Sequence, residues 1–164
     1  MSRIPYFTDI DFNDLDGIYD ITIPFDNREI SIDLNFDSES VDQFIIDKIS
    51  DFLGKLPAYH AFNLQIIEDD YADGDTVSDY LQFHLKHMSE AEINTLIDVN
   101  NDAISKEEQL IKSLHLVRIG LYPEQEKGDY FAIFDYSFGK HLTGHVVVIS
   151  LQEDGSFDHI TMES

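Results

Sequence analysis

The stretch IYDITIPFDNREISIDLNF, residues 18–36, decides the fold that we expect. Apolar side chains occupy every second position on both sides of its centre, at Tyr19, Ile21, Ile23 and Phe25 and again at Ile30, Ile32, Leu34 and Phe36. This alternation is the period of a β-strand with one buried face. Asp26 and Asn27, between the two runs, favour a tight turn. The sequence therefore predicts an amino-terminal β-hairpin.

Apolar residues at helical spacing follow the hairpin. Segments at about 40–56, 58–71 and 77–88 carry this spacing, and two shorter segments end at about 97 and 113. Residues that cap helices open four of these segments, in the pairs Ser40 with Gln43, Thr76 with Asp79, Ser89 with Glu92, and Ser105 with Glu108. The middle of the chain is therefore expected to be helical.

The last third of the chain is β-like, in stretches at 114–122, 129–138, 145–152 and 156–162. Short connectors between them predict a four-stranded antiparallel meander. We expect an α+β fold in which the hairpin joins the same sheet and the helices lie on one face. No linker interrupts the chain, so residues 1–164 are predicted to form a single domain.

The most unusual feature of the composition is its charge. The chain has 33 acidic and 10 basic residues, for a formal net charge of −23. Such a chain repels nucleic acids and anionic membranes and attracts basic proteins. There is no cysteine, no apolar run long enough to cross a membrane and no signal peptide at the amino terminus. We therefore expect a cytoplasmic protein that binds neither nucleic acid nor membrane.

One segment has the spacing of a calcium-binding loop. Asp98, Asn100 and Asp102 match the first three ligand positions of an EF-hand loop. Ala103 stands where glycine is needed, and Gln109 stands where a bidentate glutamate closes the site. The same residues suit a polar connector between two helices, and we predict no calcium site here.

His84 and His87 are the other metal candidates, because they lie three residues apart on a predicted helix. With a nearby carboxylate such as Asp79 they could hold zinc. Since a zinc site needs at least three protein ligands and these two supply only part of a set, the prediction is two solvated histidines and no metal. Motifs for nucleotide, flavin or metal cofactors are absent, so no cofactor is predicted.

Arg118 and Asp135 are charged residues inside otherwise apolar strands. Such charges are usually paired or lie at a functional cleft. If 114–122 and 129–138 form a hairpin, the two side chains face each other directly or diagonally. We predict that they pair, either as a structural ion pair or in a ligand-binding cleft with Tyr122, Tyr136 and His145 at its rim.

The chain also resembles an uncharacterised bacterial family of small acidic proteins, a catalogued domain of unknown function. The resemblance rests on REISIDLNFD at 28–37, DYLQFHL at 79–85, RIGLYP at 118–123 with FAIFDYSFG at 131–139, and DHITMES at 158–164. These stretches and their spacing cover nearly the whole chain. The resemblance implies a single domain in a bacterial cytoplasm, and it implies no substrate and no catalytic residue.

Three classes of function remain open. The first is a non-enzymatic interaction protein whose acidic face binds a basic protein partner, as immunity proteins do when they neutralise toxins. The densest acidic run, EDDYADGD at 68–75, is the predicted contact, through Glu68, Asp69, Asp70, Asp73 and Asp75. The second is a small-ligand binder or enzyme with its cleft around Arg118 and Asp135. The third is a calcium or zinc module. The first is favoured.

Overall fold

The amino-terminal hairpin forms one edge of the sheet. In the computed structural model, which describes residues 3–125 and 129–164, β1 (Ile18–Phe25) pairs antiparallel with β2 (Arg28–Asn35). Asp26 and Asn27 join them with φ angles of +49° and +63°. Two such residues make a turn whose twist matches the twist of the strands, and Asp and Asn tolerate this conformation better than most residues.

Five helices follow among the described residues: α1 (Gln43–Leu53), α2 (Leu56–Asp73), α3 (Thr76–His87), α4 (Glu90–Leu96) and α5 (Lys106–Ser113). Ser89 and Glu92 form the predicted capping box of α4, and Ser105 accepts the predicted bond from Glu108 N–H at the start of α5. The predicted start of α1 is wrong, because Asp42 rather than Ser40 caps it by accepting from Ile45 N–H.

The carboxy-terminal strands are β3 (His115–Leu121), β4 (Ala132–Ser137), β5 (Val146–Leu151) and β6 (Phe157–Glu163). All six described strands form one sheet in the order β1-β2-β3-β4-β5-β6. β2 and β3 run parallel, with Ile32 opposite Ile119 and Leu34 opposite Leu121, and the other neighbours run antiparallel. Strands and helices are segregated along the chain, so the fold class is α+β.

The predicted arrangement of the sheet is wrong. We expected a hairpin and a four-stranded antiparallel meander, whereas the structure has a six-stranded mixed sheet that contains a parallel pair. The physical reason is the long helical segment between β2 and β3, which returns the chain to the same end of the sheet as a crossover for parallel strands. Alternation within a strand specifies which side chains are buried, and it does not specify the neighbouring strand.

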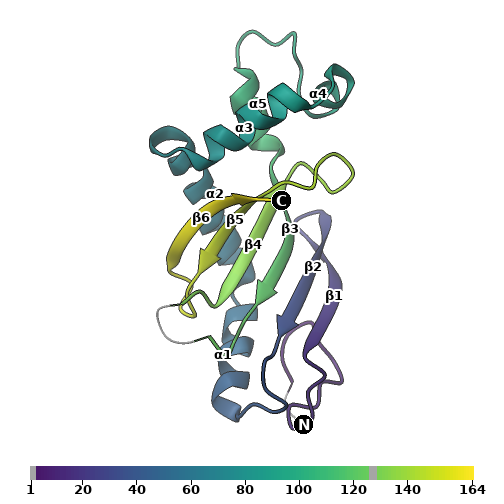
Figure 1. Cartoon of the computed structure of the whole chain (residues 1–164), viewed down its shortest axis with the longest axis vertical. Helices are drawn as coiled ribbons and strands as arrows, with labels where there is room; N and C mark the ends of the chain where they lie inside the picture. Colours follow the sequence, from purple (N-terminus) through teal and green to yellow (C-terminus); the bar gives the residue numbers. More distant parts are fainter. Residues whose placement is uncertain (1–2, 126–128) are drawn as a thin grey trace.

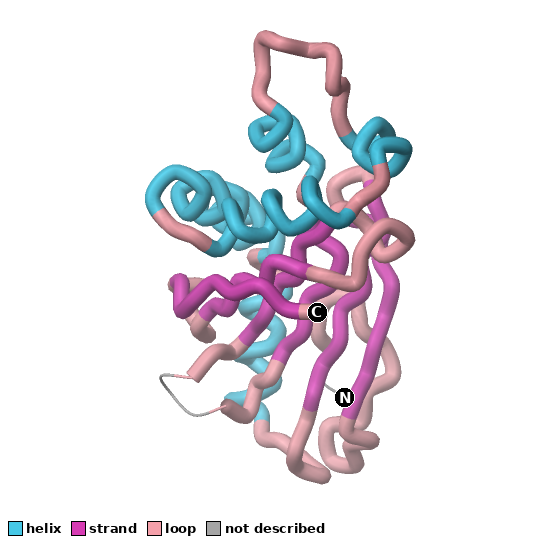
Figure 2. Tube along the Cα trace, turned by 45° about the horizontal axis from the view of Figure 1, so that its top comes forward, coloured by secondary structure: helices cyan, strands magenta, loops and turns pink. Residues whose placement is uncertain are grey.

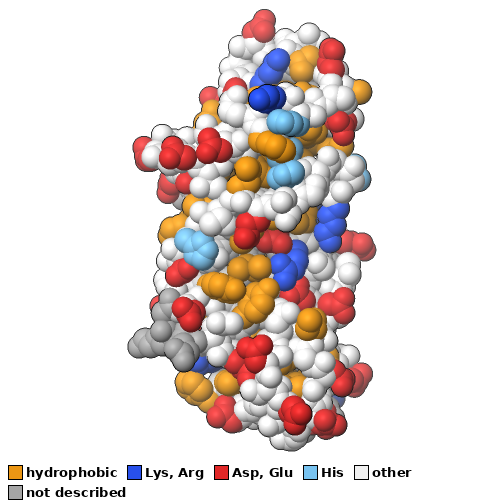
Figure 3. All heavy atoms as spheres, viewed as in Figure 1, with side chains coloured by type: hydrophobic (Ala, Val, Ile, Leu, Met, Phe, Trp, Pro, Cys, Tyr) orange, Lys and Arg blue, Asp and Glu red, His pale blue; other side chains and the backbone are white. Residues whose placement is uncertain are grey.

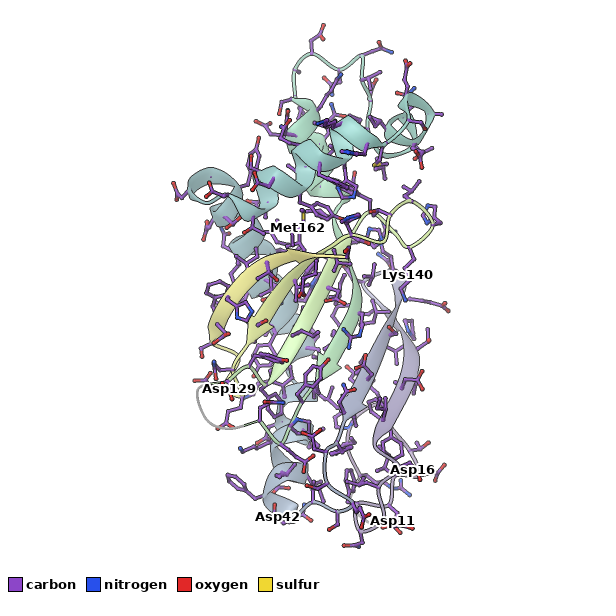
Figure 4. All side chains as sticks on the ribbon, viewed as in Figure 1. Asp11, Asp16, Asp42, Asp129, Lys140 and Met162 are labelled. Atoms are coloured by element: carbon purple, nitrogen blue, oxygen red, sulfur yellow. The ribbon has the colours of Figure 1, made fainter. Side chains whose placement is uncertain are left out.

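The predicted placement of the helices on one face is also wrong. α1 and α2 lie behind the sheet, while α3, α4 and α5 form a group across one end of it (Figure 1). Figure 2 shows the same group standing above the strands. Met162, near the end of β6, lies below α3 (Figure 4).

The two faces of the sheet have different chemistry. The face toward α1 and α2 is the core, and its fully buried side chains include Ile32, Ile119, Phe134 and Ile149. Phe52 of α1 packs on Phe134 with ring centroids 6.2 Å apart. The other face, which we call the open face, is turned to the viewer in Figure 1, and α1 and α2 do not lie over it. Because side chains alternate along a strand, charged residues of the middle strands lie on this face.

Candidate interaction site on the open face

A network of charged side chains crosses three neighbouring strands on the open face. Arg118 of β3 donates from Nε and Nη2 to the two carboxylate oxygens of Asp33 on β2, at 2.7 and 2.9 Å. Its Nη1 donates to Oδ2 of Asp135 on β4 at 3.2 Å, and Nη2 also donates to the Tyr122 hydroxyl at 3.2 Å. The predicted pairing of Arg118 with Asp135 is confirmed, and the closer partner is Asp33.

Gly120 gives the guanidinium its place above the sheet. A Cβ atom at this position would lie 2.7 Å from Arg118 Nη2 and 3.2 Å from Asp33 Oδ2, which is too close for the group to remain. Asp33 faces Gly120 across the parallel pair, while Arg118 faces Asp135 across the antiparallel pair. The register of three strands therefore brings the two carboxylates to opposite sides of one cation.

The two carboxylates are held differently. Burial would lower the pKa of Arg118, but its hydrogen bonds to Asp33 and Tyr122 and the charges of Asp33 and Asp135 raise it above the ordinary value. Burial raises the pKa of Asp135, and the Arg118 charge offsets this only in part. Oδ1 of Asp135 is buried and has no hydrogen-bond partner among the described residues. Asp33 therefore carries the strong ion pair, and Asp135 is a buried carboxylate with one long contact.

Aromatic side chains border the network. Tyr130 packs edge-on against Tyr122, with ring centroids 5.5 Å apart, and lies 6.4 Å from the ring of His159 on β6. In the space-filling view, basic and acidic side chains lie together at the middle of this face beside a hydrophobic area (Figure 3). The open face thus presents charged and apolar side chains next to each other.

The five predicted ligand residues do not lie together. Arg118, Asp135 and Tyr122 share the network, but Tyr136 points to the core face, where its hydroxyl lies 3.0 Å from Nδ1 of His60. His145 lies beyond the end of the strands, with its ring 4.4 Å from that of Phe83 on α3. The predicted cleft around all five residues is therefore wrong.

The acidic run at 68–75 forms the end of α2 and its connection to α3. Glu68, Asp69, Asp73 and Asp75 are exposed. Asp70 accepts from Val77 N–H at 2.7 Å and so satisfies a free donor at the start of α3. Four of the five predicted partner-binding carboxylates are therefore exposed to a partner, whereas Asp70 stabilises the start of α3.

The EF-hand-like segment is closed by protein groups. Gln109 accepts from Asp98 N–H at 2.8 Å and donates to the carbonyls of Asp98 and Ile104 at 3.1 and 3.2 Å. Asp98 itself accepts from Asn100 N–H. The amide of Gln109 thus occupies the position from which a glutamate would reach a metal, and it holds the connector shut.

His84 and His87 were predicted to be two solvated histidines, and this prediction is wrong for His84. His84 is buried, with Nδ1 2.8 Å from the Tyr80 carbonyl and Nε2 2.8 Å from the Thr143 hydroxyl. His87 is exposed and stacks on Phe83. Residues 3–125 and 129–164 contain no group of three or more His, Cys, Asp or Glu side chains placed to hold a metal ion.

Comparisons with known proteins give no relative for this chain. No protein-family model, no curated protein and no solved structure matches it. The resemblance to a bacterial family of small acidic proteins therefore stays a prediction. Within the described part of the chain, no helix is both long and apolar enough to span a membrane.

Proposed function

We propose that this chain is a non-enzymatic, acidic interaction protein that binds a basic protein partner across the open face of its sheet. The observation that carries the proposal is a row of carboxylates on neighbouring strands of that face, with Arg118 as its cation. Asp20 of β1 lies directly opposite Asp33 of β2, and Asp135 follows on β4 beyond Arg118. Glu163 of β6 is close enough to Asp135 to raise its pKa, after the effects of burial and Arg118.

The row carries more negative charge than its own cation can balance. Four carboxylates and one guanidinium leave the row negative, and Asp20 and Asp33 are like charges on directly opposite positions, which destabilises a pair of strands. A partner that places Lys or Arg side chains over the row would relieve this repulsion. The gain would appear in both affinity and association rate and would weaken with salt.

The overall acidity of the chain does not by itself identify the open face as the surface that binds the partner. Carboxylates occur at both ends of the molecule, and Asp11, Asp16 and Asp42 lie at the end near the amino terminus (Figure 4). The open face differs because its charges lie beside Tyr122, Tyr130 and other partly buried groups. Desolvated charges beside aromatic surface give a partner more than a solvated carboxylate can.

The end of α2 offers a second contact for the same partner. Acidic side chains gather where α2 and α3 meet, and they are visible from the same side as the open face (Figure 3). The carboxylates near the end of α2 lie at the negative end of the helix dipole, and the last turn contains no basic residue that would offset this negative charge. Glu68, Asp69 and Asp73 of α2 would therefore gain from a basic partner as well, and Asp75, the N-cap of α3, adds a fourth exposed charge beside them.

The geometry gives less support to an enzyme or a small-ligand binder at Arg118. Asp33, Asp135 and Tyr122 together accept from four of the five N–H groups of the guanidinium. A substrate anion would have to displace Asp33 from a bidentate ion pair. Arg118 therefore supports the carboxylate row and is poorly placed as an anion receptor.

The partner class that we propose is a basic protein in a bacterial cytoplasm, such as a toxin that an immunity protein neutralises. The test is to capture partners from host lysate at about 50 mM and about 300 mM salt, on either side of physiological screening. Asp20→Asn with Glu163→Gln removes the exposed ends of the row without touching Arg118. Asp51→Asn with Asp102→Asn removes two exposed charges elsewhere and serves as the matched control.

The partner should bind about tenfold more weakly to the row variant, equal to about 1.4 kcal/mol, and the control should bind as the parent does. A third variant, in which Glu68, Asp69, Asp73 and Asp75 become amides, reports on the end of α2. If the affinity of the partner changes neither with salt nor in the row variant, the proposal is contradicted. Turnover of a small molecule by the purified protein would favour the enzyme hypothesis instead.

A further inference from the structure

A pocket of about 370 Å³ lies on the core side of the sheet, near the tip of the β1–β2 hairpin. Three separate segments line it: the hairpin tip, the middle of α2, and the junction between α5 and β3. Its apolar lining includes Phe25, Leu64, Ile67 and Leu116, and Leu64 is an exposed large hydrophobic residue. A volume of this size is at the lower end of the range for small-molecule sites.

Two basic residues line this pocket, although the chain has only 10 basic residues in all. Arg28 and Lys112 line it, and both are exposed. Within residues 3–125 and 129–164, neither has a carboxylate within 4.0 Å, in contrast to Arg118 with its two. Asp26 and Glu68 also line the pocket, so its formal charge is zero on a molecule of net charge −23. The pocket is therefore a site where an anion meets much less repulsion than elsewhere.

We propose that this pocket binds a small organic anion that has an apolar body and one carboxylate group. The carboxylate would lie among Arg28, Lys112, His60 and His115. The apolar body would cover Phe25, Leu64 and Ile67. Guanidinium and ammonium groups form strong charge-assisted hydrogen bonds with carboxylates. This site is independent of the open face, because its lining belongs to the opposite side of the sheet.

His60 connects the pocket to a buried polar cluster. Its Nε2 lies 3.5 Å from Oδ2 of Asp26, and its Nδ1 lies 3.0 Å from the Tyr136 hydroxyl. Because a carboxylate only accepts, the proton of the neutral ring belongs on Nε2, and Tyr136 donates to Nδ1. Asn63, one turn along α2, is fully buried beside Tyr136, and its hydrogen bond to the Tyr136 hydroxyl opposes the rise in pKa that burial causes there. Such polar groups in a core cost stability, and they are expected where a site needs them.

His115 adds a second polar group at the pocket. Its Nδ1 donates to the Ser113 carbonyl at 3.0 Å, which leaves Nε2 as an acceptor in the neutral ring. Burial lowers the pKa of His115, and the charges of Arg28 and His141 lower it further. A carboxylate bound beside Arg28 would oppose this effect. Binding should therefore raise the pKa of His115, which gives the experiment a local readout.

The test uses octanoate as the probe, with octylammonium and octanol as probes of the same chain length. Two-dimensional NMR of the whole chain would follow the amides and the imidazole protons during each titration. Octanoate should cause saturable shifts at Arg28, His60 and His115, and the other two probes should not. This order of preference is informative because nonspecific attraction to a chain of charge −23 favours the ammonium probe.

Variants locate the carboxylate. Arg28→Gln and Lys112→Gln should each weaken octanoate binding about tenfold, as expected for the loss of one charge-assisted hydrogen bond. Lys106→Gln removes the same charge from an exposed position at the start of α5, outside the pocket lining, and should leave binding unchanged. The proposal is overturned if octanoate shifts these residues no more than octylammonium does, or if Arg28→Gln and Lys106→Gln bind it equally well.

Discussion

The network around Arg118 predicts an order of stability for three variants. Arg118 makes two short bonds to Asp33, at 2.7 and 2.9 Å, and one longer bond to Asp135 at 3.2 Å. The side chains of Asp33 and Asp135 are 14% and 12% exposed, so both carboxylates depend on the cation. We therefore expect Arg118→Met to be the most destabilising change, Asp33→Asn the next, and Asp135→Asn the least.

The magnitudes follow from what each change leaves behind. Arg118→Met leaves two largely buried carboxylates without a cation, which typically costs about 3 to 5 kcal/mol. Asp33→Asn removes the bidentate ion pair, and we expect a loss of about 2 to 3 kcal/mol because bonds to charged groups contribute about 1.5 to 3 kcal/mol each and this pair is partly solvated. Asp135→Asn removes one long bond and a carboxylate whose pKa burial already raises, so its cost should be about 1 kcal/mol or less.

Urea denaturation followed by circular dichroism measures these differences, and thermal unfolding checks them. For a chain of this length, 1 kcal/mol shifts Tm by roughly 2 to 4 °C, so Arg118→Met should lower Tm by roughly 6 to 20 °C. Lys86→Met removes an exposed cation from α3 and serves as the control. If Asp135→Asn costs as much as Asp33→Asn, the assignment of Asp33 as the principal partner is wrong. A neutral Arg118→Met would show that the network is solvated.

Three further changes test other parts of the structure. Gly120→Ala should destabilise the fold by about 1 to 3 kcal/mol in urea, because the new Cβ would lie 2.7 Å from Arg118 Nη2. Gln109→Ala should speed amide exchange at 98–104 with little change in global stability, because its hydrogen bonds close only that connector. Burial lowers the pKa of His60, His84 and His115, so their imidazole protons should titrate below about 6.5. Since the unfolded chain then binds protons first, their contribution to the free energy of unfolding should fall as pH decreases from about 7 to about 5.

The pairing of Arg118 with Asp135 could be predicted because it is local. The two residues lie on consecutive strands, so a hairpin brings them face to face. Asp33 was missed because it is 85 residues from Arg118 in the chain and meets it only across the parallel β2–β3 pair. No pattern within either strand specifies that neighbour, since alternation determines the face of a side chain and not the strand beside it.

Two other errors had a signal in the sequence. Asp135 and Tyr136 are adjacent in one strand, so alternation alone puts them on opposite faces and excludes a shared cleft. His60 and Asn63 occupy the buried stripe of α2 between Leu56 and Ile67, at helical spacing. Polar residues within an apolar stripe indicate a buried polar cluster, and this pattern could have identified the cluster with Tyr136.

The alternation in β4 also makes the two proposed sites separable. Asp135 belongs to the open face, while Tyr136, the next residue, belongs to the cluster beneath the pocket. The sheet lies between them, so a partner on the open face does not cover Arg28 or Lys112. Octanoate and a basic partner that contacts only the open face should therefore bind together, each with nearly the affinity that it has alone. Strong coupling between them would require either a change in the sheet or a partner contact at Glu68, which lines the pocket and also belongs to the acidic end of α2, because linkage needs a difference that both ligands sense.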